Sequence, residues 1–233
     1  MAMSTYDDQR GRLETYFDRT AVAAWEQLTS TAPVSRIRAT VRAGRDRMRD
    51  LLLGWLPADL TGARLLDAGC GTGALSAEAA RRGAEIVGVD VAGNLIDIAR
   101  ERLPQEIDAS KVAFHVGDML SASFGSFDHV VAMDSLIHYQ VGDITGALAS
   151  LAPRVRRSIV FTVAPATPLL TVMHAAGKLF PRADRAPAIA PASLKKLTAR
   201  IAAEPALAGW RVGRSERVMS GFYTSQAMEL IAP

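Results

Sequence analysis

The sequence predicts an α/β protein with a doubly wound, mostly parallel β-sheet, and three observations support this fold class. Short β-branched or apolar runs alternate with helical stretches between residues 64 and 164. The first run enters a glycine-rich loop that leads into a helix. The 233 residues, 49% hydrophobic and 22% charged, suffice to bury a core without a disulfide or metal. Parallel strands joined by right-handed crossovers bring their carboxyl ends to one edge, where ligands bind.

The expected elements follow from hydrophobic periodicity and from turn residues. Two amphipathic helices, at 8–29 and 34–55, come first. Strands are expected at 64–67, 85–90, 111–116, 127–133 and 158–164, with helices at 74–82 and 94–103. Residues 164–192 are rich in proline and predict an insertion over the sheet edge, with an amphipathic helix at 169–180. A helix at 194–203 and a hairpin of strands at 210–219 and 221–231 are expected to close the chain. We therefore divide it into a helical arm or lid (1–57), a core (58–164), a cap (165–193) and the rest of the core sheet (194–233).

Composition excludes several classes of function. The single cysteine, Cys70, excludes an intramolecular disulfide and cysteine-rich zinc sites, and no protein-bound metal is expected. A net charge of only +3 without a recognisable module argues against nucleic-acid binding. No apolar run is long enough to cross a bilayer, and the polar start does not resemble a signal peptide, so we expect a cytoplasmic protein. Residues 36–49 hold six arginines and one acid, a local excess that the net charge hides. Weak attachment to a membrane surface stays open.

The glycine loop after the first strand is the most informative segment. Gly69, Gly71 and Gly73 bring backbone N–H groups close to a ligand at the start of a helix. This spacing alone also fits the dinucleotide site of an oxidoreductase. Asp67, two residues before the first glycine, argues against that alternative because its carboxylate would repel a pyrophosphate. The same carboxylate would suit the ammonium of a methionyl group.

Two more acids follow the next two strands. Asp90 ends the second strand, where a carboxylate can bind the two hydroxyls of a ribose. Asp118, between Gly117 and Met119, follows the third strand and can accept from an adenine amino group while Met119 packs on the ring. Taken singly, either acid could instead cap a helix. Three acids in this order predict a nucleoside site.

Residues 67–73, Asp90, Gly117–Asp118 and the Phe127–Val131 run resemble the motifs of class I S-adenosylmethionine-dependent methyltransferases. The resemblance implies a Rossmann-like, seven-stranded and mostly parallel sheet with one antiparallel strand near the C-terminus. It also implies S-adenosyl-L-methionine as co-substrate. Further cofactor-binding candidates are Arg42, as a cation near the cofactor carboxylate, and Cys70, Val91, Met133 and Asp134.

Tyr16–Phe17 through Trp25, Val41–Gly44, Asp134–Tyr139 and Phe222–Tyr223 resemble one subfamily, the magnesium-protoporphyrin IX O-methyltransferases of chlorophyll and bacteriochlorophyll synthesis. The resemblance implies magnesium-protoporphyrin IX as substrate, His138 as a catalytic residue and the porphyrin-binding subunit of magnesium chelatase as a partner. It also leaves room for a position at the photosynthetic membrane. Relatives place a tyrosine four residues after the arm tryptophan, where this chain has Thr29, so Tyr16 is the candidate substitute.

The acceptor would be a propionate carboxylate, already ionised at pH 7, so His138 is expected to position it rather than to act as a strong base. In the cap, apolar residues between Leu169 and Phe180 would face the macrocycle, and Lys178, Arg182 and Arg185 could meet propionates or form a solvated surface. Alternatives are a methyltransferase for a quinone or phenol, a non-catalytic S-adenosylmethionine-binding protein, and a structural role for His138.

Overall fold

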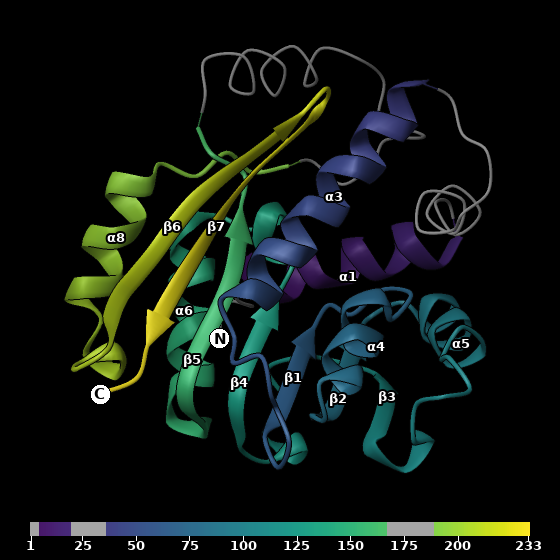
Figure 1. Cartoon of the computed structure of the whole chain (residues 1–233). Coiled ribbons are helices and arrows are strands. Elements are labelled where there is room, and N and C mark those ends of the chain that lie inside the picture. The colour runs from purple at the N-terminus through teal and green to yellow at the C-terminus, as the bar shows by residue number, and fades with distance from the viewer. Residues whose placement is uncertain (1–4, 20–35, 167–188) are drawn as a thin grey trace.

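The computed structural model describes residues 5–19, 36–166 and 189–233, and its centre is one seven-stranded sheet of order β3-β2-β1-β4-β5-β7-β6 (Figure 1). Strands β1 to β5 are parallel, and β7 is antiparallel to both of its neighbours. The mostly parallel sheet with one antiparallel strand is therefore confirmed. The strands are β1 Arg64–Ala68, β2 Glu85–Asp90, β3 Val112–Val116, β4 Phe127–Ala132, β5 Val155–Val163, β6 Arg211–Ser220 and β7 Tyr223–Ile231.

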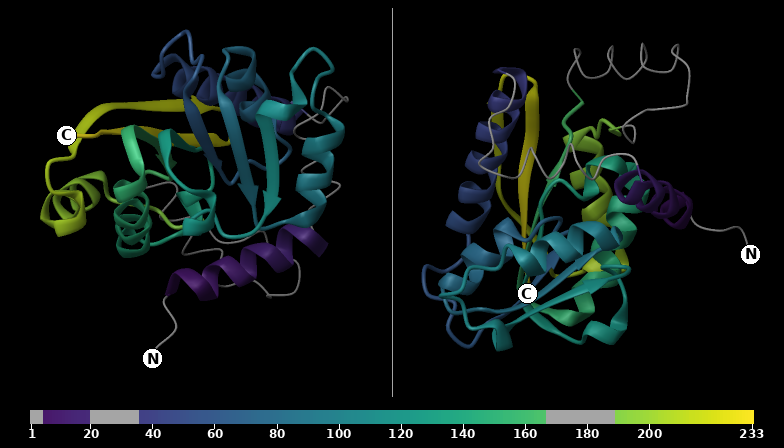
Figure 2. Two further views of the ribbon diagram at one scale, coloured as in Figure 1. Left: turned by 90° about the horizontal axis from the view of Figure 1, so that it is seen from below. Right: turned by 90° about the vertical axis from the view of Figure 1, so that its right-hand side faces the viewer.

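Helices cover both faces of the sheet (Figure 2). In the described part of the chain they are α1 Thr5–Arg19, α3 Arg36–Gly54, α4 Ala74–Arg81, α5 Gly93–Glu101, α6 Val141–Leu151 and α8 Leu194–Ala203. The α3 and α4 helices pack their apolar residues on one face, whereas α6 and α8 share the core on the other face with α1. Short 3-10 turns occupy several connections, among them η3 Leu136–His138 after β4.

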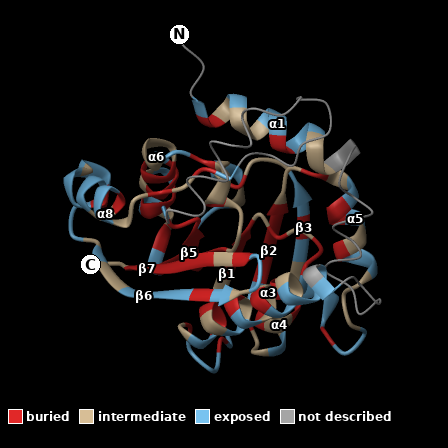
Figure 3. Ribbon diagram, turned by 90° about the horizontal axis from the view of Figure 1, so that it is seen from above, coloured by how far each residue is buried: buried red, intermediate tan, exposed pale blue. Residues whose placement is uncertain are grey.

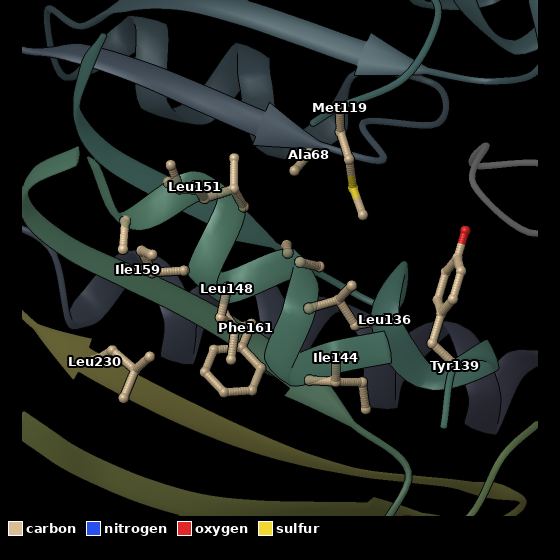
Figure 4. Packing of buried hydrophobic residues seen from close by; sticks show 14 of the residues in the cluster. Ala68, Met119, Leu136, Tyr139, Ile144, Leu148, Leu151, Ile159, Phe161 and Leu230 are labelled. Carbon is tan, nitrogen blue, oxygen red and sulfur yellow. The ribbon is translucent and has the colours of Figure 1, made fainter. Parts of the chain in front are cut away.

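The sequence prediction did not include α6. Its two glycines, Gly142 and Gly146, lower the helix propensity of the segment. Tertiary packing overrides this, because Ile144, Leu148 and Leu151 lie on one helical face and are buried. Figure 4 shows this face against the apolar side chains of β5.

The α3 helix belongs to the core as much as the strands do. Met48, Leu52 and Leu53 are fully buried, and the helix lies along the β6–β7 hairpin (Figure 1). A Cβ at Gly44 would lie 2.6 Å from the Tyr223 ring, so only glycine allows this approach. The domain boundary predicted between the arm and the core at residue 57 stays a prediction. The α3 helix, which was assigned to the arm, packs its apolar residues against the sheet.

Burial follows the layers of the fold (Figure 3). The central strands are buried on both sides, as expected of a parallel sheet between helices. The edge strand β6 is mostly exposed and charged, which discourages pairing with another chain. No helix among the described residues is long and apolar enough to span a membrane.

Several predictions fall outside the described residues. They concern Trp25, Thr29, the helix at 169–180 and the cap cations Lys178, Arg182 and Arg185. The described cap residues near its two ends, at 165 and 192, form a short parallel bridge.

Candidate functional site

A cavity of about 560 Å³ opens at the carboxyl ends of β1, β2 and β4. This volume lies within the range typical of small-molecule sites. All the predicted site residues line it except Tyr16, Gly73 and Asp118. The lining ones are Arg42, Asp67, Gly69, Cys70, Gly71, Asp90, Val91, Gly117, Met119, Met133, Asp134 and His138.

The glycine loop needs its glycines for two physical reasons. Gly69, Gly71 and Gly73 have φ of 82°, 53° and 77°, a left-handed conformation that costs glycine little. A Cβ at Gly69 would lie 2.4 Å from Cβ of Ser135, and one at Gly73 would lie 2.9 Å from the Phe114 ring. The loop is therefore packed tightly between the sheet and the turn after β4. Gly73 supports the loop although it does not line the cavity.

Hydrogen bonds from nearby backbone N–H groups orient the Asp90 carboxylate. Its Oδ2 accepts from the Gly71 N–H at 2.9 Å, and its Oδ1 accepts from the Ala92 N–H at 3.0 Å. The carboxylate is half-buried at the cavity, and a carboxylate oxygen can accept more than one hydrogen bond. This arrangement suits two hydroxyl donors from a ribose.

Asp67 is the most buried acid of the cavity, with 1% of its surface exposed. The Ser76 hydroxyl donates to its Oδ2 at 2.6 Å. Burial raises the pKa of Asp67 to about 7; the Ser76 hydrogen bond opposes this shift and the nearby Asp90 carboxylate adds to it. A cationic ligand group in the cavity would favour the ionised form.

Asp118 lies beside the cavity and contacts α1. It accepts from the Tyr6 hydroxyl at 2.9 Å and from Arg10 at 2.6 Å. Tyr6 in turn stacks on Tyr139, with ring centroids 4.8 Å apart. Burial, as the main cause, raises the pKa of both tyrosines. The acid predicted to bind adenine thus ties α1 to the sheet edge, and its adenine role stays a prediction.

His138 ends the η3 turn and lines the cavity half-buried. The Phe17 ring of α1 lies edge-on to the His138 ring, with centroids 6.3 Å apart. Tyr16 does not line the cavity; its ring packs edge-on against Phe17 at 5.2 Å, and burial raises its pKa. The catalytic role predicted for Tyr16 stays a prediction without a contact to the cavity.

Asp134, predicted to bind the cofactor, lines the cavity, but its carboxylate is used within the protein. Arg45 of α3 donates to Oδ2 at 2.7 Å, and the Tyr223 hydroxyl donates to Oδ1 at 3.1 Å. Met133 before it is half-buried and also lines the cavity.

The sequence prediction missed several lining residues. Arg45, Asp46 and Arg49 of α3 line the cavity together with Arg42. Their spacing from Arg42 places them on one helical face, and this spacing is the sequence signal that could have identified them. Other missed residues are Tyr6, Leu13, Thr72, Ser135 and Tyr139.

The donor set fits S-adenosylmethionine. Gly69 and Gly71 present backbone without a side chain to the cavity, and Asp67, Asp90 and Arg42 supply charges for an ammonium, hydroxyls and a carboxylate. In the described part of the chain, no three histidine, cysteine or acidic residues form a group that could hold a metal ion.

Comparison with known proteins agrees with this chemistry. Residues 132–232 match the family model of the magnesium-protoporphyrin IX methyltransferase C-terminus, and residues 65–158 match a methyltransferase domain. The chain is 50% identical to the magnesium-protoporphyrin O-methyltransferase of Rhodobacter capsulatus, over 97% of this chain and 98% of that protein. It is 27% identical to the Synechocystis enzyme of the same name, over 96% of each. The crystal structure of magnesium protoporphyrin IX methyltransferase from Synechocystis with bound SAH superposes with a TM-score of 0.82, at 25% identity over 96% of this chain and 99% of that one.

Proposed function

The chain belongs to the magnesium-protoporphyrin O-methyltransferases, and we propose that the cavity at the carboxyl ends of β1, β2 and β4 is where it carries out methyl transfer. It is an S-adenosylmethionine-dependent enzyme that methylates magnesium-protoporphyrin IX. The proposed location is supported by one observation above all: a single cavity is lined by the glycine loop, by Asp67 and Asp90, and by His138.

We assign the cofactor contacts by charge and position. Asp90 would receive the ribose hydroxyls, and Asp67 would face the methionyl ammonium. Arg42, which lines the cavity, would be the cation for the methionyl carboxylate, because the neighbouring Arg45 is paired with Asp134. When bound, S-adenosylmethionine supplies a sulfonium methyl group, which is the electrophile for the acceptor oxygen.

The residues around His138 position the acceptor and exclude water. A propionate is ionised at pH 7, so no strong base is required. His138 donates a hydrogen bond to one carboxylate oxygen, which leaves the other oxygen free to be methylated. Leu13 and Phe17 of α1 line the cavity and act as a cover over this region. Orientation of this kind contributes about 7–11 kcal/mol to lowering a barrier.

Replacement of His138 tests this assignment. His138→Ala is expected to slow single-turnover methyl transfer about 10²–10⁴-fold, with little change in the affinity for S-adenosylhomocysteine. His138→Gln should recover part of the rate, because an amide can donate the same hydrogen bond. His115→Ala, at an exposed histidine of β3, is the control. A His138→Ala enzyme with the control's rate would remove His138 from the mechanism.

We also propose that the β6–β7 turn contacts an anionic membrane surface. Met219 and Phe222 are 63% and 68% exposed there. Because β6 is parallel to β5, this turn lies at the same sheet edge as the cavity. Arg36 and Arg47 are exposed on the adjoining helix α3, and Arg47 donates to the Met219 carbonyl. Apolar side chains beside arginines suit an interface with anionic lipids, through which an apolar macrocycle can be reached.

Vesicle flotation tests this contact. The protein should float with phosphatidylglycerol vesicles at low salt and much less with phosphatidylcholine vesicles. Serine at both Met219 and Phe222 should abolish flotation, whereas serine at Val116, 54% exposed on the opposite edge strand, should not. Equal flotation of the double variant would contradict the proposal.

Delivery of substrate by the porphyrin-binding subunit of magnesium chelatase is proposed on the family resemblance alone. A porphyrin-loaded chelatase subunit should be methylated faster than free porphyrin at equal concentration. Equal rates would contradict direct delivery.

A further inference from the structure

We propose that Asp134 is a positioning residue for methyl transfer, whose carboxylate holds the turn that carries His138; the proposal rests on the role assigned above to His138. Asp134 lies two residues after β4 ends at Ala132, and His138 is the last residue of the short 3-10 turn that follows. The function of Asp134 would thus be to orient another residue and not to contact the reacting atoms.

The carboxylate of Asp134 joins three separate elements of the fold. Its side chain is 4% exposed. Arg45 of α3 donates to it at 2.7 Å, the Tyr223 hydroxyl of β7 at 3.1 Å and the Thr162 hydroxyl of β5 at 3.3 Å. Ser225 of β7 adds a longer contact of 3.4 Å. Such a buried and fully bonded carboxylate is a fixed point, because removing it would leave several buried donors without an acceptor.

The backbone of Asp134 is itself held in an uncommon conformation. Its φ is 55°, and among the described residues it is the one non-glycine position with positive φ. Its N–H donates to Thr162 Oγ1 at 2.7 Å, and Thr162 is fully buried. Aspartate tolerates the left-handed region better than most residues, yet such strain persists only where the surroundings maintain it. The contacts of the carboxylate and the N–H provide that support.

The turn beyond Asp134 has little freedom of its own. Ser135 packs on Gly69, where a Cβ would lie 2.4 Å from the serine Cβ. The Ile137 carbonyl accepts from the Ala190 N–H at 2.8 Å, and the Tyr139 N–H donates to Leu136 at 3.1 Å. The orientation of this compact turn relative to the sheet therefore depends on the backbone conformation of Asp134, at the point where the chain leaves β4. A change of φ at Asp134 would move His138 relative to the glycine loop.

Three substitutions separate the carboxylate from the backbone. Asp134→Asn keeps tolerance of positive φ and one acceptor oxygen. Asp134→Gly keeps the backbone conformation at little cost but removes the carboxylate, and Asp134→Ala removes both. We expect single-turnover rates to fall in the order Asn, Gly, Ala, with Ala slower by about 100-fold, the loss that a misplacement of about 1 Å can cause. Asp97→Ala, at an exposed aspartate of α5, is the control for loss of a carboxylate.

A double-mutant cycle with His138→Ala tests whether Asp134 acts through His138. The prediction is that Asp134→Ala slows the reaction about 100-fold when His138 is present and less than about threefold when it is absent. The affinity for S-adenosylhomocysteine should change far less than the rate, and Asp134→Asn should restore most of the rate that Asp134→Ala loses. If Asp134→Ala does not fold, Asp134→Gly and Tyr223→Phe replace it in the same cycle, and each should slow the reaction only when His138 is present.

The outcomes distinguish two failures. Equal slowing in both backgrounds, or a loss of S-adenosylhomocysteine affinity that matches the loss of rate, would overturn the positioning role of Asp134 and leave that of His138 intact. A normal rate for His138→Ala alone would overturn the role of His138, and the inference about Asp134 with it.

Discussion

Replacement of Asp67 by asparagine tests whether a buried carboxylate sets the pH dependence of cofactor binding. Asp67 is 1% exposed at the end of β1, and its Oδ2 accepts from Ser76. Asparagine has nearly the same shape and keeps an acceptor for Ser76, but it cannot become negative. The variant therefore removes the charge and leaves the packing of the site.

The expected magnitude follows from the raised pKa of Asp67, which burial moves to about 7. Below pH 7 the side chain is mainly protonated, so it offers no charge to the methionyl ammonium. If only the ionised form binds well, a group with a pKa of 7 gives an affinity about tenfold higher at pH 8 than at pH 6. Asparagine should abolish this dependence, and it should lower the affinity most at pH 8.

The same raised pKa affects stability with a definite sign. The folded protein holds the Asp67 proton from the ordinary pKa of 3.8 up to about 7, whereas the unfolded chain releases it. The free energy of unfolding should therefore decrease as the pH rises through this window. The asparagine variant should lack this part of the decrease.

Calorimetry with S-adenosylhomocysteine at pH 6, 7 and 8 measures the effect on binding. Titrations in buffers of different ionisation enthalpy also count the protons released on binding, which should number close to one at pH 6 and near zero at pH 8. A wild-type affinity independent of pH, or an equal pH dependence in Asp67→Asn, would refute the assignment of Asp67 to the ammonium.

Three further predictions concern the cofactor, the core and α1. Asp90→Ala should weaken S-adenosylhomocysteine binding by about 1.5–3 kcal/mol in calorimetry, whereas Asp97→Ala should not; equal affinities would exclude the ribose assignment. Leu52→Ala should lower the free energy of denaturant unfolding by about 2–5 kcal/mol because Leu52 is fully buried; a loss below 1 kcal/mol would show that α3 is not part of the core. Tyr6→Phe removes the hydrogen bond to Asp118 and should lower the stability of α1 against local opening by about 1 kcal/mol. Hydrogen exchange of the α1 amides measures this, and unchanged protection would contradict the prediction.

The order of the elements and the position of the glycine loop could be predicted from local patterns alone. β2 and α8 begin and end where the sequence predicts, because β-branched runs and a serine N-cap act over a few residues. Asp67 and Asp90 could be placed at one edge because parallel strands bring their carboxyl ends together. The co-substrate followed from these local features and from the motifs that resemble the family.

Contacts between residues far apart in the chain could be decided only by the tertiary structure. Nothing near Asp118 in the sequence indicates that Tyr6, 112 residues away, donates to it. Likewise, Asp134 reads as a cofactor residue until packing brings Arg45 and Tyr223, each 89 residues distant, to its carboxylate. A carboxylate binds whichever donors the fold brings within hydrogen-bond distance, and the local sequence does not indicate which distant donors those are. The sequence thus determined which chemical groups the site contains, and the tertiary packing decided which of them face the cavity and which hold the others in place.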